Sequence, residues 1–162
     1  DIFYKKLPEH SIEGADAIVH GPRVFIGISH RTSMDAIKVL QKELTDFDIL
    51  PIVFNPKYLH LDCVFNILSA KDALIFPDAL DKNMVELLSS MYNLIEVSES
   101  EQFSMGTNVL SIGQNRVISL PINHDVNLQM RQHGYQVIEV DFSEIIKSGG
   151  SFRCCSMPIE RR

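Results

Sequence analysis

One pattern occurs three times along this chain: a short strand, a second strand, an amphipathic helix and a third strand. Each helix is predicted from apolar residues at helical spacing, and each strand from a short apolar run bounded by turn residues. Units of this kind must pack against neighbours, because none can cover its apolar face alone. The sequence therefore predicts an α/β protein of about three ββαβ modules, over residues 13–54, 60–98 and 107–141.

The length and charge of the chain narrow the classes of protein. At 162 residues it fits a single domain with a substantial core. Its formal net charge of −6 argues against a nucleic-acid partner, which requires a basic face. We expect no membrane partner, because no stretch approaches the roughly 20 apolar residues of a membrane span. The start, DIFYKKLPEH, lacks the apolar core of a signal peptide, so a cytoplasmic location is expected.

The segment GGSFRCC near the C-terminus contains the candidate nucleophile. Cys154 follows the flexible pair Gly149 and Gly150, where the backbone can approach a ligand closely. An inert buried thiol is the alternative, since that is the commonest state of a free cysteine. Cys155 is expected to face the other way on a strand and to pack. The odd total of three cysteines favours reduced thiols over a disulfide framework.

The segment LHLDC contains a histidine and a carboxylate two residues apart. If it is a strand, His60 and Asp62 point to the same face. Burying both among apolar neighbours would cost several kcal/mol unless a ligand such as a cation compensated the charge. The alternative is a histidine held at the end of a strand. A thiol, an imidazole and a carboxylate together indicate covalent catalysis.

Other polar residues have ordinary explanations on spacing alone. Glu13 and Asp16 are most simply turn or cap groups, and Arg31 a surface residue at a helix start. His60 and the three cysteines could in principle bind zinc, but their spacing matches no common ligand pattern. We therefore expect no metal and no cofactor.

Four motifs together are more specific. EGAD at 13–16, FIGISHRT at 25–32, LHLDC at 59–63 and GGSFRCC at 149–155 follow one another in this order. In these motifs the chain resembles the guanidino-group-modifying enzymes, or penteins, especially dimethylarginine dimethylaminohydrolase, with arginine deiminase and amidinotransferase as relatives. The resemblance implies a propeller of ββαβ modules, of which this chain would hold about three and a closing strand. Ala15 departs from the usual glycine of the first motif.

The resemblance also implies a role for each candidate residue. Cys154 would be the nucleophile, His60 the general acid and base, and Glu13 the support of the histidine. The substrate-binding residues would be Arg31 for the α-carboxylate, Asp62 for the guanidinium, Asp16, and Ser148 near the α-amino group. Since a neutral thiol is a poor nucleophile, either positive charge lowers the pKa of Cys154 or the bound cation induces its ionisation.

The implied function is hydrolysis of the guanidinium C–N bond of arginine or a methylated arginine, through a cysteine thiouronium, giving citrulline and an amine. Amidino transfer, arginine deimination and non-catalytic arginine binding are the alternatives. Family members carry a further acidic motif in an N-terminal half. Residues 1–162 are therefore expected to be the C-terminal part of a catalytic domain. The expected partners are a small guanidine and, to complete the propeller, a missing N-terminal segment or another chain.

Overall fold

The computed structural model describes residues 11–157. Residues 1–10, on which the signal-peptide argument depends, and residues 158–162 lie outside this part. The described residues form two compact units that divide between Leu61 and Asp62, and each is described by itself. The single domain predicted over 1–162 stays a prediction. None of the helices between residues 11 and 157 has the length and apolar character that a membrane crossing requires.

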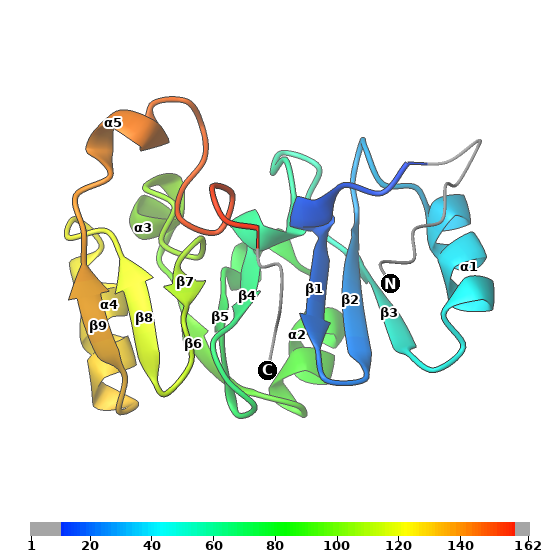
Figure 1. Ribbon diagram of the computed structural model, residues 1–162, viewed down its shortest axis with the longest axis horizontal. Coiled ribbons are helices and arrows are strands. Elements are labelled where there is room, and N and C mark those ends of the chain that lie inside the picture. The colour runs from blue at the N-terminus through cyan, green and yellow to red at the C-terminus, as the bar shows by residue number, and fades with distance from the viewer. Residues whose placement is uncertain (1–10, 158–162) are drawn as a thin grey trace. The chain divides into compact units, whose positions relative to one another are not determined.

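The first unit contains one ββαβ module (Figure 1). A 3₁₀ turn, η1 (Gly14–Asp16), leads into β1 (Ala17–His20), β2 (Arg23–Ile28), α1 (Met34–Glu43) and β3 (Asp48–Val53). β2 is the central strand, antiparallel to β1 and parallel to β3. Ser33 caps α1 by accepting a hydrogen bond from the Ala36 N–H. The core of this unit lies between sheet and helix and contains Val24, Ile26, Ile37 and Ile49.

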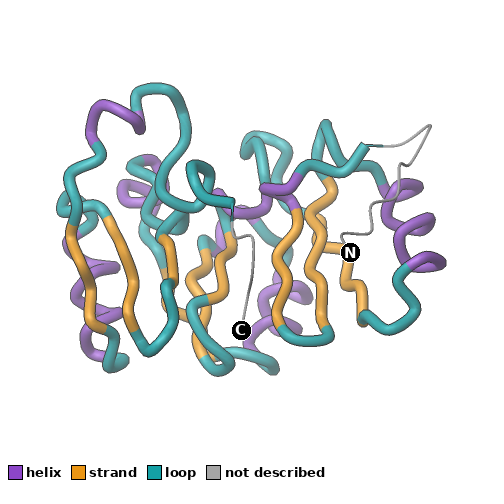
Figure 2. The backbone as a smooth tube through the Cα atoms, in the orientation of Figure 1, coloured by secondary structure: helices purple, strands orange, loops and turns teal. Residues whose placement is uncertain are grey.

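The second unit contains the other two modules (Figure 2). One consists of β4 (Phe65–Ile67), β5 (Asp72–Ile75), η3 (Pro77–Ala79), α2 (Lys82–Ser89) and β6 (Asn93–Glu96). After α3 (Glu99–Phe103), the other consists of β7 (Leu110–Ser111), β8 (Arg116–Ser119), α4 (His124–Gln132) and β9 (Gln136–Glu139). Both sheets repeat the order and strand directions of the first. The predicted series of three ββαβ modules is confirmed.

The two modules of the second unit share one core. Leu74 and Ile95 from the earlier module pack in the same cluster as Val117, Val126 and Met130 from the later one. A buried polar group also joins them, because the Asn66 side-chain amide donates to two carbonyl oxygens of the chain that enters β7. The unit is therefore held together by both apolar and polar contacts between its modules.

Two predicted strands are turns instead. LHLDC runs into a 3₁₀ turn, η2 (Leu61–Cys63), so the same-face prediction for His60 and Asp62 is wrong. After α5 (Ser143–Ile146), residues 151–157 form turns rather than the predicted closing strand. Two of their backbone donors are used locally, from Cys155 N–H to Ser151 O and from Ser156 N–H to Arg153 O. Cys155 is exposed, so the prediction that it packs on a strand is also wrong.

Candidate active site

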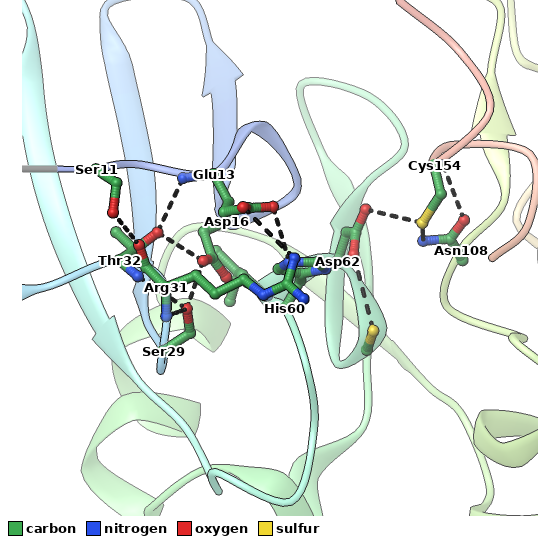
Figure 3. A network of polar contacts seen from close by, with 12 residues as sticks. Ser11, Glu13, Asp16, Ser29, Arg31, Thr32, His60, Asp62, Asn108 and Cys154 are labelled. Atoms are coloured by element: carbon green, nitrogen blue, oxygen red, sulfur yellow. Dashed lines mark hydrogen bonds and ion pairs between the residues drawn. The ribbon is translucent and has the colours of Figure 1, made fainter. Parts of the chain in front are cut away.

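In the first unit, one carboxylate contacts both an imidazole and a guanidinium (Figure 3). Glu13 Oε2 lies 3.3 Å from His60 Nε2, and Glu13 Oε1 lies 3.5 Å from Arg31 Nη1. The His60 side chain is only 12% exposed, whereas those of Arg31 and Glu13 are open to solvent at 53% and 39%. Three of the predicted site residues therefore meet in this unit, with the histidine partly enclosed and the arginine accessible.

Asp16 organises the same region from inside the unit. Its side chain is fully buried, and Oδ2 accepts hydrogen bonds from Ser29 Oγ at 2.6 Å and Thr32 Oγ1 at 2.7 Å. Oδ1 accepts from the Leu61 N–H at 3.0 Å, directly after His60. All three donors are groups of the protein rather than of a ligand. Asp16 therefore fixes the backbone beside His60, and its contact with substrate stays a prediction.

In the second unit, Asp62 and Cys154 come together across 92 residues of sequence. The Asp62 side chain is 1% exposed, and its Oδ2 lies 3.6 Å from both Cys154 Sγ and Arg153 Nε. Oδ1 lies 3.8 Å from Cys63 Sγ. On the other side of the nucleophile, Asn108 Nδ2 donates to Cys154 Sγ at 3.2 Å. The candidate nucleophile thus has a buried carboxylate and a buried amide as partners (Figure 3).

These surroundings suppress ionisation of the candidate nucleophile. Cys154 is exposed as a residue, yet removal of its sulfur from water raises the pKa of the thiol, and the charge of Asp62 raises it further. Hydrogen bonds from the Ser151 backbone and the Asn108 side chain lower the pKa by less. The structure therefore does not show a Cys154 whose pKa is lowered before a substrate binds, which was the first of the two options for activating the thiol.

Ser148 makes its hydrogen bonds to the last turn of α5. It is exposed in the turn after α5, and its hydroxyl donates to the Ile145 carbonyl. Arg153 and Asn108, by contrast, were missed by the sequence reasoning. Arg153 adjoins the nucleophile in the sequence, whereas Asn108 is the second residue of the strand predicted from residue 107, and nothing there pointed to Cys154. Within residues 11–157 no group of three or more His, Cys, Asp or Glu side chains could hold a metal ion.

Comparison with known proteins places this chain among the penteins. A family model described as N,N dimethylarginine dimethylhydrolase, eukaryotic, matches residues 4–161. The Bacillus subtilis protein YkgA is 51% identical over 160 residues, which cover 99% of this chain and 56% of YkgA. The N(G),N(G)-dimethylarginine dimethylaminohydrolase of Mycobacterium tuberculosis is 31% identical over 156 residues, covering 93% of this chain and 50% of that enzyme. The chain thus spans about half the length of these relatives.

The fold is also similar to that of a solved structure. An amidinotransferase from Microseira wollei superposes with a TM-score of 0.85 at 24% identity, over 97% of this chain and 50% of that structure. The three ββαβ modules therefore share the fold of that structure. Together with the family model, this places them in the pentein class, the guanidino-group-modifying enzymes. Within that class, the chain belongs to the family of the N,N dimethylarginine dimethylhydrolases. The resemblance found in the four motifs is confirmed.

Proposed function

We propose that the protein hydrolyses the guanidinium C–N bond of arginine or a methylated arginine through a covalent intermediate on Cys154. The observation that carries the proposal is the thiol 3.6 Å from a buried carboxylate, Asp62. A carboxylate there keeps the thiol protonated while the site is empty. A planar cation paired with Asp62 would offset that charge and lower the pKa of Cys154, so that the nucleophile forms where its substrate is bound.

The proposed reaction has two stages. In the first, the thiol proton passes to His60, the thiolate attacks the guanidinium carbon, and His60 returns the proton to the nitrogen that leaves as the C–N bond breaks. In the second, His60 takes a proton from water, whose oxygen attacks the thiouronium carbon. The C–S bond then breaks, its electron pair and the His60 proton go to sulfur, the remaining hydroxyl proton passes to solvent, and citrulline is released.

The remaining predicted residues serve binding and orientation in this proposal. Glu13 orients the His60 ring, which its contact with Nε2 supports. Arg31 pairs with the substrate α-carboxylate, a role that its exposure supports. Asp16 and Ser148 assist binding, Asp16 through the backbone at Leu61 and Ser148 near the α-amino group.

Amidino transfer and deimination of arginine are the second candidates, and one residue favours them. Asp62 stands where, by the resemblance, deiminases and amidinotransferases carry a guanidinium-binding aspartate and many dimethylargininases have lysine. In deimination the leaving group is ammonia. In amidino transfer the C–N bond to the δ-nitrogen of arginine breaks, ornithine leaves, and an amine such as glycine takes the amidino group from sulfur in the second stage. All of these reactions begin with attack of the Cys154 thiolate on the guanidinium carbon, so the products must decide between them.

Product analysis tests the proposal. The protein is incubated with arginine or asymmetric dimethylarginine, with and without glycine, and citrulline, ammonia, dimethylamine and guanidinoacetate are measured. We expect citrulline from at least one substrate, abolished in Cys154→Ser and retained in Cys155→Ser. Guanidinoacetate formed only with glycine would establish transfer instead. Undiminished turnover in Cys154→Ser would overturn the hydrolase. Residues 1–162 by themselves are expected to be weak or inactive, so binding of arginine without any product would overturn it only in a protein that includes the expected N-terminal segment.

A further inference from the structure

Asn108 anchors the turn that carries Cys154. It is fully buried between α3 and β7. Its carbonyl oxygen accepts from the Arg153 N–H at 3.4 Å, and its side-chain Oδ1 accepts from the Cys154 N–H at 3.2 Å. The preceding residue, Thr107, donates to the Cys63 carbonyl at 2.7 Å. Asn108 is thus held beside both the nucleophile and the chain that follows Asp62.

The backbone hydrogen bond fixes which way the Asn108 amide faces. A backbone N–H can only donate, so the group that meets Cys154 N–H must be the oxygen Oδ1. The Nδ2 group is then turned toward Cys154 Sγ, 3.2 Å away. The opposite orientation would place two donors against each other. The sulfur therefore faces an N–H donor on one side and, at Asp62, a carboxylate acceptor on the other.

We propose that Asn108 is a catalytic residue that holds the Cys154 sulfur and stabilises its thiolate, an inference that rests on the proposed function. When the S–H bond ionises, its proton leaves to a base and the electron pair stays on sulfur, where it strengthens the hydrogen bond from Nδ2. Asp62 favours the thiol because it accepts the S–H. A cation that pairs with Asp62 removes this opposition. The same N–H stabilises the thiolate again when the C–S bond breaks.

A purely structural role would need only the bond from the Cys154 N–H to Oδ1. The substitution Asn108→Asp keeps an oxygen that accepts from that N–H and removes the donor to sulfur, but it also adds a negative charge that raises the pKa of the thiol. Asn108→Ala removes the donor without the charge and is measured beside it. The test measures the rate at which iodoacetamide alkylates Cys154 as a function of pH, by peptide mass spectrometry. In this reaction the thiolate forms the S–C bond and iodide leaves.

We expect alkylation of Cys154 in Asn108→Asp to be slower by about tenfold or more near pH 8, with a midpoint at higher pH, since one pKa unit is a tenfold change in thiolate. Cys155 in the same molecule is the internal control and should keep its rate. Asn115→Asp, which makes the same chemical change in an exposed turn, should leave Cys154 unaffected.

The test remains decisive if the charged substitution unfolds the protein, which circular dichroism would show. Asn108→Ala then carries the test, because it removes the donor without adding charge, and slower alkylation of Cys154 is again expected. An unchanged pH profile at Cys154 in either folded variant would overturn the proposal. Iodoacetamide needs no guanidine site, so a wild-type protein without turnover would refute the proposed function and leave this result separate.

Discussion

Asp62 and Asn108 differ by little more than one oxygen and one nitrogen, yet they act on the Cys154 sulfur in opposite directions. The carboxylate raises the pKa of the thiol, and the amide lowers it. Because both are buried, neither effect is diluted by water as it would be at the surface. The reactivity of the thiol is thus set by the balance of two neighbours, which single substitutions can shift.

Asp62→Asn should make the unliganded thiol more reactive and the protein less active. Removing the negative charge lowers the pKa of Cys154, so at fixed pH a larger fraction is thiolate and alkylation by iodoacetamide should quicken, by about tenfold for each pKa unit. Turnover of a guanidine should fall because the partner of the cation is lost. Paired measurements of labelling rate and citrulline formation check both directions.

Cys155 again serves as the reference, since the same substitution should leave its labelling unchanged. Slower or unaltered labelling of Cys154 in Asp62→Asn would show that the carboxylate does not hold the thiol in its protonated form.

Strand β2 brings its backbone close to the base of the Glu13, His60 and Arg31 cluster at Gly27. A Cβ at this position would lie 2.7 Å from Phe54 Cε1, 2.8 Å from Leu61 Cβ and 3.2 Å from Asp16 Oδ1. Two of these are contacts that real side chains do not make. Only glycine therefore allows β2 to pass beneath the residues that position His60.

Gly27→Ala should lower the free energy of unfolding by about 1–3 kcal/mol, the usual cost of overpacking a core. It should also reduce turnover, because Asp16 and Leu61 must move. Gly14→Ala is the matched control for stability, since a Cβ there meets nothing within 4 Å. Urea unfolding of both variants measures the difference, and equal stability would contradict the close approach.

A second polar cluster joins the two modules of the second unit at Asp72. Burial opposes its ionisation, but hydrogen bonds from Tyr135, Asn93, His133 and Ser69 outweigh it and hold the pKa of Asp72 below its ordinary value. The Tyr135 hydroxyl donates to Asp72 at 2.8 Å, and burial raises the pKa of Tyr135 to about 12. Hydrogen-bond donors from both modules thus stabilise the Asp72 carboxylate in its charged form.

Tyr135→Phe should cost about 0.5–1.5 kcal/mol of stability near pH 7, with more if Asp72 is left short of donors. A carboxyl group with a lowered pKa stabilises the fold above its ordinary value, 3.8, and this contribution is lost as the pH falls through the lowered pKa. The variant should therefore lose less stability on acidification than the wild type. Urea unfolding at pH 7 and pH 3 measures this, and identical losses would contradict the role of the tyrosine.

Much of the secondary structure could be predicted, because the residues that begin and end a helix act on neighbours close in the sequence. Asp81 accepts from the Met84 N–H and starts α2 as expected, and Gly134, with φ of +87°, ends α4. Local patterns failed where short polar and apolar alternation is compatible with two structures, as in the 3₁₀ turn at Asp62. The contact of Asn108 with Cys154 spans 46 residues and depends on tertiary packing, so no spacing could have revealed it.

The whole molecule carries its candidate residues in two sets, one in each compact unit. Glu13, Arg31 and His60 meet in the first, and Asp62, Asn108 and Cys154 in the second. The proposed reaction draws on residues of both sets. The second set gives the more specific prediction. Because Cys154 lies beside the buried carboxylate of Asp62, its thiol should react faster with a cation than with a neutral molecule of the same shape.

Competition between two alkylating agents measures that discrimination most directly. Chloroacetamidine is cationic and chloroacetamide is its neutral counterpart, and both label a thiol with loss of chloride. Relative to chloroacetamide, and normalised to labelling of Cys155, chloroacetamidine should label Cys154 about tenfold faster or more, because one charge-assisted contact is worth about 1.5–3 kcal/mol. Asp62→Asn should abolish the preference. Equal labelling of Cys154 by the two reagents in the wild-type protein would contradict a guanidinium-directed nucleophile.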